Sequence, residues 1–223
     1  MTNDAPVRRT SRAESTELTR RKLIDAALDL YSRRSYADVT IRDIASAAGV
    51  AHGLLSHHFG GKEGLYQEAL GEVGRQLVAT RDTDPDATAR ERLRQMLRAH
   101  LDYLVDHEAL AVNLILRHSA DTGPGTVPAF EEIVWTGLMT ISELLDVDAE
   151  QPATRAALHS FACAADDLTL QWLNDGRPFD CDAMVEAIIA LLAGALRAAA
   201  ELGPGLNLDR FVEVLVPRGA ERS

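Results

Sequence analysis

Two short helices that meet at a tight turn are predicted for residues 40–60, and this stretch constrains the fold more than any other. Thr40 and Asp43 have the spacing of a capping box, with the hydroxyl on an orphan helix amide and the carboxylate facing the positive helix N-terminus. Gly49 supplies the left-handed backbone that ends the first helix. The second helix, expected over 51–58, leaves polar side chains on its outer face. The pattern predicts a helix-turn-helix, whose second helix can lie in the major groove of DNA.

This stretch and its flanks resemble the TetR family of bacterial transcriptional regulators. The matching positions keep fixed spacing between Arg20 and Leu70. They are Ile24, Ala26, Ala27, Thr40, Ile44, Ala45, Ala48, Gly49, Val50, Gly53, Leu55, His58, Phe59, Lys62, Glu63, Gly64 and Leu65. The resemblance implies an all-α protein with an N-terminal three-helix helix-turn-helix DNA-binding domain and a C-terminal helical domain for ligand binding and dimerisation.

Three residues depart from the pattern of that family. Ser35 stands where the family usually has a glycine that closes the first helix, and a left-handed serine there costs about 1 kcal/mol. Ala51 replaces the usual serine and removes both a helix cap and a hydroxyl for phosphate. Ser56 replaces the usual tyrosine and keeps a hydroxyl of shorter reach. These changes leave the predicted fold intact and put the usual phosphate contacts in doubt.

The resemblance implies two groups of DNA contacts. Contacts with the DNA backbone are expected from Thr40, Ser56, His57 and Lys62, and the residues nearest the base edges are His52, Gly53 and Leu54. Lys62 opens the next helix, where its ammonium and the helix amides can share a phosphate. Leu54 offers methyl groups to a thymine, and His52 can bond a purine. The alternatives are a partly exposed core position for Leu54 and a phosphate contact for His52.

The charge is distributed unevenly along the chain. The 223 residues carry a net charge of −11, which by itself argues against a nucleic-acid partner. Residues 1–66, however, carry ten Lys/Arg against eight Asp/Glu, whereas 67–223 carry thirteen against twenty-six. Only the N-terminal part can therefore approach phosphate, and its affinity for DNA should fall steeply with salt. Residues 1–16 are interpreted as a flexible basic arm that reaches into the minor groove, or else as a solvated tail.

Helical periodicity continues to the end of the chain and predicts an all-α architecture. The basic run at Arg20 is expected to open the first helix, within a DNA-binding domain over 17–66. A regulatory and dimerisation domain follows over 67–223. The helix at 62–81 links the two domains and can act as a lever between them. The other helices are expected over 90–108, 109–119, 128–147, 152–174, 182–202 and 208–216.

The second domain is predicted to form a homodimer and to bind a small molecule. The helices within 152–202 are apolar around more of their circumference than one core requires, which indicates a four-helix bundle made by two copies. A pocket between these helices and the lever is expected to hold a neutral or cationic hydrophobic effector, since the domain is acidic. The candidate residues of this pocket are the polar His100, Tyr103, Asn113, His118, His159 and Asp166, together with the largely apolar Trp135.

Catalysis, metal binding and cofactor binding are not expected. Asp166 and Asp167 are adjacent and therefore point about 100° apart on a helix, which does not suit a shared metal or an acid–base pair. The histidines lack metal-ligand spacing, and no phosphate-binding glycine loop occurs. Two cysteines without a close pair favour a reducing compartment. The apolar run 187–196 is too short to span a bilayer, so a cytoplasmic location is expected.

The leading hypothesis is a dimeric repressor that occupies a palindromic operator and leaves it when a small hydrophobic ligand binds. One alternative is a DNA-bound regulator or activator controlled by a protein partner. Another is a helical interaction module without specific DNA binding, which the changes at Ala51 and Ser56 would explain.

Overall fold

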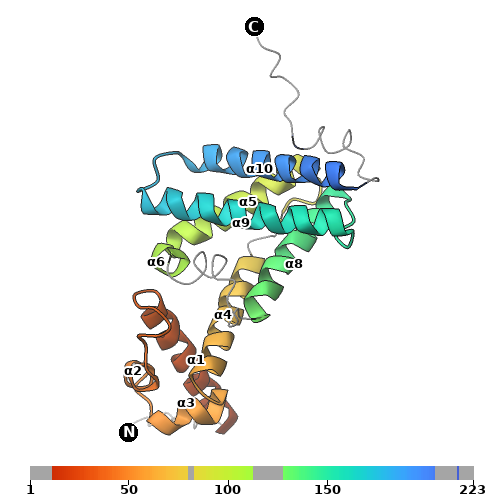
Figure 1. Ribbon diagram of the computed structural model, residues 1–223. Coiled ribbons are helices and arrows are strands. Elements are labelled where there is room, and N and C mark those ends of the chain that lie inside the picture. The colour runs from red at the N-terminus through yellow and green to blue at the C-terminus, as the bar shows by residue number, and fades with distance from the viewer. Residues whose placement is uncertain (1–11, 80–82, 113–127, 204–214, 216–223) are drawn as a thin grey trace, which may run out of the picture. The chain divides into compact units, whose positions relative to one another are not determined.

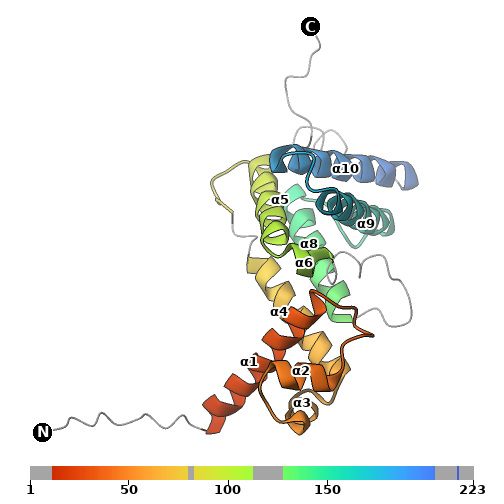
Figure 2. The same ribbon diagram turned by 90° about the vertical axis from the view of Figure 1, so that its left-hand side faces the viewer.

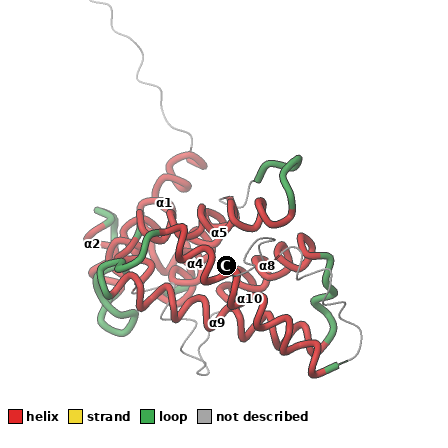
Figure 3. The backbone as a smooth tube through the Cα atoms, turned by 90° about the horizontal axis from the view of Figure 1, so that it is seen from above, coloured by secondary structure: helices red, strands yellow, loops and turns green. Residues whose placement is uncertain are grey.

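A computed structural model describes residues 12–79, 83–112, 128–203 and 215. Every regular element within these ranges is helical and no strand occurs in them (Figures 1 and 3), which confirms the predicted all-α class. The chain forms two compact units, residues 1–69 and 70–223, which meet within one helix, α4 (Lys62–Ala79). The sequence placed this boundary at residue 66.

The first unit contains α1 (Arg12–Tyr31), α2 (Ile41–Ala47), α3 (His52–Phe59) and the start of α4. Its core is formed by fully or almost fully buried side chains from each helix: Leu23, Ile24, Ala27, Tyr31, Ile44, Leu55 and Leu65. α1 begins at Arg12, so the expectation that the helix opens at Arg20 and that the arm extends to residue 16 was wrong. Glu14 lies in the first turn and faces the positive helix N-terminus, which favours the earlier start.

The capping box at Thr40 and the left-handed backbone at Gly49 are both present as expected. The Thr40 hydroxyl accepts from the Asp43 amide at 3.1 Å, and the Asp43 carboxylate accepts from the Thr40 amide at 3.0 Å. These hydrogen bonds, together with nearby Arg34, lower the pKa of Asp43. Gly49 has a φ of +64°. Ser35 is not among the non-glycine residues with positive φ, so it carries no left-handed strain, and its hydroxyl donates to the Asp38 carboxylate.

The second unit contains the rest of α4 with α5 (Ala89–Asp106), α6 (Glu108–Leu110), α8 (Pro128–Leu145), α9 (Pro152–Asn174) and α10 (Cys181–Leu202). α9 and α10 lie side by side as an antiparallel pair, and α5 packs against α10 (Figures 1 and 2). The Trp172 indole donates to the Phe179 carbonyl at 2.8 Å and closes the connection between α9 and α10. The helix expected over 109–119 falls mostly outside the described residues, as does the one over 208–216.

Ion pairs fix the register of α5 against α10. Arg90 and Arg94 both reach the Glu186 carboxylate, and Arg98 bonds Asp182 one turn earlier on α10 at 2.8 Å. The Arg90 guanidinium also donates to the carbonyl of Leu215, at 2.8 Å. Arg94 and Arg98 are four residues apart on α5, and their partners Glu186 and Asp182 are four residues apart on α10. The two ion pairs are therefore separated by about one turn on each helix.

Among the described helices, α10 alone is long and apolar enough to cross a membrane by length and composition. Of its most apolar window, 44% is buried against the rest of the protein. The core helix of a globular protein meets the same criteria, so this single helix is weak evidence for a membrane.

Candidate DNA interface and effector cavity

The position of α3 is fixed by close packing at both of its ends. At the start, the Val50 amide donates to the Ala45 carbonyl at 3.0 Å and holds the turn after α2. Leu55 is fully buried and anchors the middle of the helix. At the end, Gly64 of α4 lies so near the Phe59 carbonyl oxygen that an added Cβ would be 1.9 Å from it. The outward face of α3 is therefore set by its neighbours.

Four of the five α3 residues predicted to contact DNA are exposed, namely His52, Gly53, Ser56 and His57. Leu54 is half-buried, which is compatible with both interpretations of its role. Ala51 occupies the N-cap position of α3 and makes no side-chain hydrogen bond there, because alanine lacks the hydroxyl of the usual serine. These residues share one helix and one accessible surface, and their contacts with DNA stay a prediction.

The two predicted contacts outside α3 have structural roles of their own. The Thr40 hydroxyl is an acceptor in the capping box and keeps its own hydrogen available for a phosphate. The Lys62 ammonium donates to the Tyr36 carbonyl and lies 4.0 Å from the centre of the Tyr36 ring. Partial burial and the charge of Glu63 raise the pKa of Tyr36. Because Tyr36 and Lys62 are far apart in the sequence, local patterns could not reveal this support for Lys62.

Four arginines of the first unit are bound to carboxylates. The pairs are Arg20–Glu68, Arg21–Asp25, Arg33–Asp29 and Arg34–Asp43. Lys22 and Arg42 are exposed and form no ion pair within the described part of the unit. Arg42 lies in the first turn of α2, and sequence reasoning missed it because net charge alone does not separate paired from unpaired cations.

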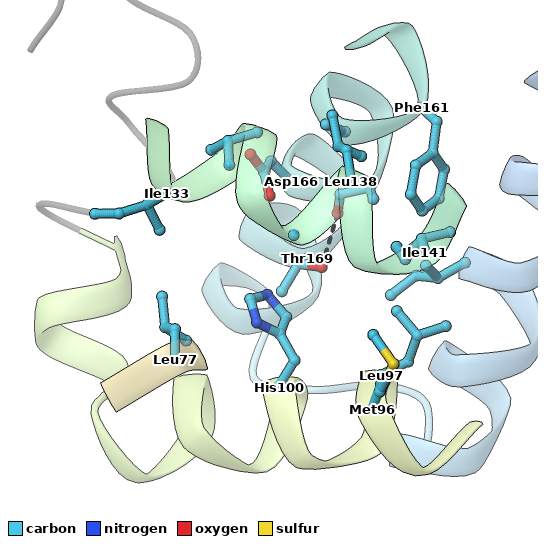
Figure 4. Close-up of a pocket in the computed structure, with 15 residues that line it drawn as sticks. Leu77, Met96, Leu97, His100, Ile133, Leu138, Ile141, Phe161, Asp166 and Thr169 are labelled. Atoms are coloured by element: carbon cyan, nitrogen blue, oxygen red, sulfur yellow. Dashed lines mark hydrogen bonds between the residues drawn. The ribbon is translucent and has the colours of Figure 1, made fainter. Parts of the chain in front are cut away.

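A cavity of about 140 Å³ lies within the second unit (Figure 4). Its walls come from α4, α5, α8, α9 and α10 and are mainly apolar. The lining residues are Leu77, Met96, Leu97, His100, Ile133, Val134, Gly137, Leu138, Ile141, Phe161, Ala162, Ala165, Asp166, Thr169 and Ile188. His100 and Asp166 are thus the two predicted pocket residues that the structure brings together.

Three other predicted pocket residues do not line this cavity. The Tyr103 hydroxyl donates to Gln76 at 2.9 Å, and its ring stacks on His107. Trp135 is half-buried beneath the guanidinium of Arg155, at 4.5 Å from the ring centre. His159 is exposed on α9.

Asn113 and His118 lie outside the described residues.

Helical periodicity identifies the apolar stripes of a helix, but it does not tell which stripe faces a cavity and which faces a neighbouring helix. The residues that line the cavity could therefore not be identified from the sequence. The residues that sequence reasoning missed, such as Ile133 and Thr169, carry no distinctive local signal. Within the described ranges, no group of three or more His, Cys, Asp or Glu side chains is arranged to hold a metal ion.

Comparison with known proteins connects these features to one family. Residues 23–69 match the family model described as bacterial regulatory proteins, tetR family. The HTH-type transcriptional activator FasR of Mycolicibacterium smegmatis is 29% identical over 184 residues, which cover 79% of this chain and 82% of that protein.

Solved structures match both units. A tetR-family transcriptional regulator from Streptomyces coelicolor has a TM-score of 0.68 and 26% identity and covers 89% of this chain and 87% of its own. FadR from Bacillus subtilis, solved in complex with stearoyl-CoA, shares the fold with a TM-score of 0.62 and 22% identity, over 77% of this chain and 96% of its own. Together with the exposed helix-turn-helix, these matches identify residues 23–69 as a tetR-family helix-turn-helix domain, and the whole chain is similar to TetR-family transcriptional regulators.

Proposed function

We propose that this regulator is a dimeric repressor that binds a palindromic operator and leaves it when a small hydrophobic molecule enters the cavity. The observation that carries the proposal is the exposed face of α3, which Leu55 and the turn after α2 hold in a fixed orientation. His52, Gly53 and Leu54 are assigned to the base edges. Ser56 and His57 are assigned to the phosphates on either side.

Cations beside α3 supply the affinity that does not depend on base sequence. We assign Arg42 to a phosphate, because it is exposed and no carboxylate in the described residues neutralises it. Lys62 is assigned to a second phosphate, with Tyr36 holding its side chain in place and Thr40 nearby in the same unit. Each such contact releases counterions, so binding weakens as salt rises.

The effector is proposed to act through α4. This helix carries Lys62 at its start and Leu77, a lining residue of the cavity, near its end. A molecule that displaces Leu77 therefore acts on the helix that leads to the DNA-binding unit. A difference of about 1–3 kcal/mol in its affinity for the two states is enough for a useful change in operator occupancy.

The homodimer is proposed to form through residues 152–202. The exposed residues along α9 and α10 include many small side chains: Ala156, Ser160, Cys163, Ala164, Ala183, Ala190, Gly194 and Ala198. Small residues allow two helices to approach closely, and a two-fold arrangement would supply two copies of α3 to two half-sites. We assign the protein to the cytoplasm, where a DNA-binding regulator acts.

Binding to the DNA that flanks the gene of this protein tests the proposal. Fluorescence anisotropy at two salt concentrations should show saturable binding that survives excess unrelated DNA and weakens at the higher salt. Arg42→Ala should weaken binding and lower the salt slope by about one. Arg33→Ala, which removes an exposed arginine already paired with Asp29, is the matched control and should change binding little. Equal effects of the two variants would contradict the assignment of Arg42.

A positive role in transcription is the second candidate, because the relative FasR is named an activator. Transcription in vitro from the bound promoter separates the two roles. A repressor lowers transcript yield and the effector restores it, whereas an activator raises transcript yield. Control by a protein partner instead of a small molecule would leave both outcomes insensitive to ligands of the cavity.

A further inference from the structure

The charge of α3 depends on pH. Among its residues, His52–Phe59, three are histidines and none is a lysine, arginine, aspartate or glutamate. An ordinary histidine titrates near pH 6.5, so α3 has little charge at pH 7.5 and gains positive charge as the pH falls to 6. Protonation of the three imidazoles would add three positive charges, whereas residues 1–66 otherwise carry only two more Lys/Arg than Asp/Glu.

The three histidines differ in how far they reach solvent. His52 and His57 are exposed, and His58 is half-buried. The rings of His57 and His58 pack edge to face, with 5.4 Å between their centres, and the ring of His58 lies 6.1 Å from that of Phe59. His57 is therefore an exposed imidazole that rests against a more buried neighbour.

The protein itself offers these imidazoles no anionic partner. Within the described residues, none of the three histidines forms an ion pair with a carboxylate. The charged groups nearest to α3 along the three helices that pack against it are Arg20 of α1, Arg42 and Asp43 of α2, and Lys62 and Glu63 of α4.

The two carboxylates of this set are directed elsewhere. Asp43 accepts from the amide of Thr40 and pairs with Arg34. The charge of Glu63 acts on Tyr36, whose pKa it helps to raise. The remaining groups are cations, which disfavour a further positive charge on α3 until an external anion is present.

A DNA phosphate is an anion that reverses this balance. A negative charge within about 4–6 Å favours the protonated form of a histidine, and a charge-assisted hydrogen bond is about twice as strong as a neutral one. A histidine that meets a phosphate therefore holds its proton more tightly in the complex than in the free protein. By linkage, complex formation takes up a proton and is favoured as the pH falls.

We infer that DNA binding takes up a proton at His57, so that the affinity for DNA rises as the pH falls from 7.5 to 6. This inference rests on the proposed role of α3 as the DNA-binding helix and adds a dependence on pH to it. His52 is assigned to the base edges, where a neutral imidazole already supplies one donor and one acceptor. No proton uptake is therefore expected at His52.

Affinities for two duplexes at pH 7.5 and pH 6.0 test the inference. The probes are the DNA that flanks the gene and an unrelated duplex of the same length, and fluorescence anisotropy gives the affinities. Uptake of one proton at a histidine should strengthen binding of the full chain about fivefold between these two pH values. The salt slope should also become steeper at pH 6.0, by up to about 0.9, because the cationic contact releases one more counterion.

Variants at three histidines show where the proton is taken up. His57→Gln keeps a polar side chain that cannot be protonated, and it should lose the gain at pH 6.0 and the steeper salt slope. His57→Lys carries a permanent charge and should bind DNA at pH 7.5 more tightly than His57→Gln, without the fivefold gain at pH 6.0. His52→Gln should keep the gain. His107→Gln, at an exposed position in the second unit, is the control and should behave as the parent does.

The parent binding equally well at both pH values, or a gain that persists in His57→Gln, would overturn the inference. Circular dichroism at both pH values checks that each variant is folded. The proposed regulator role fails separately, if the flanking DNA binds no more tightly than the unrelated duplex at either pH, and proton uptake at His57 is then still measured on both duplexes. No binding to either duplex would contradict both.

Discussion

Gly53 occupies the middle of the exposed face of α3, and a Cβ added there would meet no atom within 4 Å. The fold of the single chain therefore does not require glycine at this position. A glycine in a helix lowers stability by about 0.5–1 kcal/mol relative to alanine. A functional reason for glycine is close approach of the α3 backbone to the edges of DNA bases.

We predict that Gly53→Ala raises the free energy of unfolding by about 0.5–1 kcal/mol and weakens operator binding at least several-fold, because the methyl group meets DNA. Gly71→Ala in α4 is the control, since its Cβ would lie 3.6 Å from the flexible end of Arg75. Denaturant unfolding and anisotropy measure the two effects. Unchanged operator affinity in a stabilised Gly53→Ala protein would show that α3 does not approach the bases there.

Tyr31 is a second residue whose chemistry makes a prediction. Its hydroxyl is buried and has no hydrogen-bond partner among the described residues. Burial, with smaller effects of Tyr36 and Tyr66, raises its pKa well above the usual value. Tyr31→Phe removes an unsatisfied polar group and should leave stability at neutral pH unchanged or raise it by up to about 1 kcal/mol. Urea unfolding measures this, and a loss of more than about 1 kcal/mol would indicate that the hydroxyl has a partner.

The same variant should alter the response to alkaline pH. The folded protein holds the Tyr31 proton more tightly than the unfolded chain does, so its contribution to stability is present below the ordinary tyrosine pKa of 10.0 and is lost as pH rises above it. Burial also raises the pKa of Tyr66, to about 12, so some alkaline loss remains. Tyr31→Phe should lose less stability than the parent between pH 9 and pH 11. An identical loss in both proteins would contradict the burial of this phenol.

At the scale of elements, sequence was most informative where the signal is local. The capping box at Thr40, the turn at Gly49 and the proline at the start of α9 each specify a boundary through nearby atoms, and the structure has these boundaries. The predicted start of α1 was wrong. The prediction placed the helix N-terminus at the basic run that begins with Arg20 and did not consider Glu14, an earlier residue that suits the positive end of a helix.

Cavity residues were less predictable for a physical reason. Tyr103 and Trp135 are residue types that often line pockets, but each contacts a residue that is distant in the sequence. Tyr103 contacts Gln76, and Trp135 contacts Arg155. His100 and Asp166 line the cavity because of the relative rotation of α5 and α9, which no local pattern encodes.

The contact between Gly74 of α4 and Ile133 of α8 provides a prediction at the scale of elements. Gly74 is buried, and a Cβ added there would lie 2.2 Å from Cδ1 of Ile133, a lining residue of the cavity. Gly74→Ala should force Ile133 to move, destabilise the protein by about 1–3 kcal/mol and change the affinity of cavity ligands. In the Ile133→Ala background, the same substitution should be nearly neutral. A destabilisation of equal size in both backgrounds, measured by denaturant unfolding, would rule out this contact as the cause.

At the scale of the whole molecule, two features of the second unit fit the same role in self-association. They are its negative charge and the small exposed side chains along α9 and α10. The acidic surface is unsuited to DNA, and the small side chains are suited to a second copy. Self-association would bring two helix-turn-helix units to one operator.

Ala190→Glu should convert the protein to monomers, because it places a charge on the exposed face of α10 without disturbing the core of the protomer. Ala37→Glu, an exposed position in the first unit, is the control and should leave the molecular mass in solution unchanged. Light scattering coupled to size-exclusion chromatography gives this mass. A dimer that persists in Ala190→Glu would place the interface elsewhere.

Selection of DNA from a random double-stranded library by the purified protein decides whether this regulator recognises a specific sequence. We expect enrichment of an inverted repeat whose half-sites are centred about one helical turn, or a multiple of it, apart. We also expect the enriched DNA to bind less tightly to Gly53→Ala. A library that shows no enriched sequence after selection would contradict sequence-specific regulation and favour a helical interaction module without specific DNA binding.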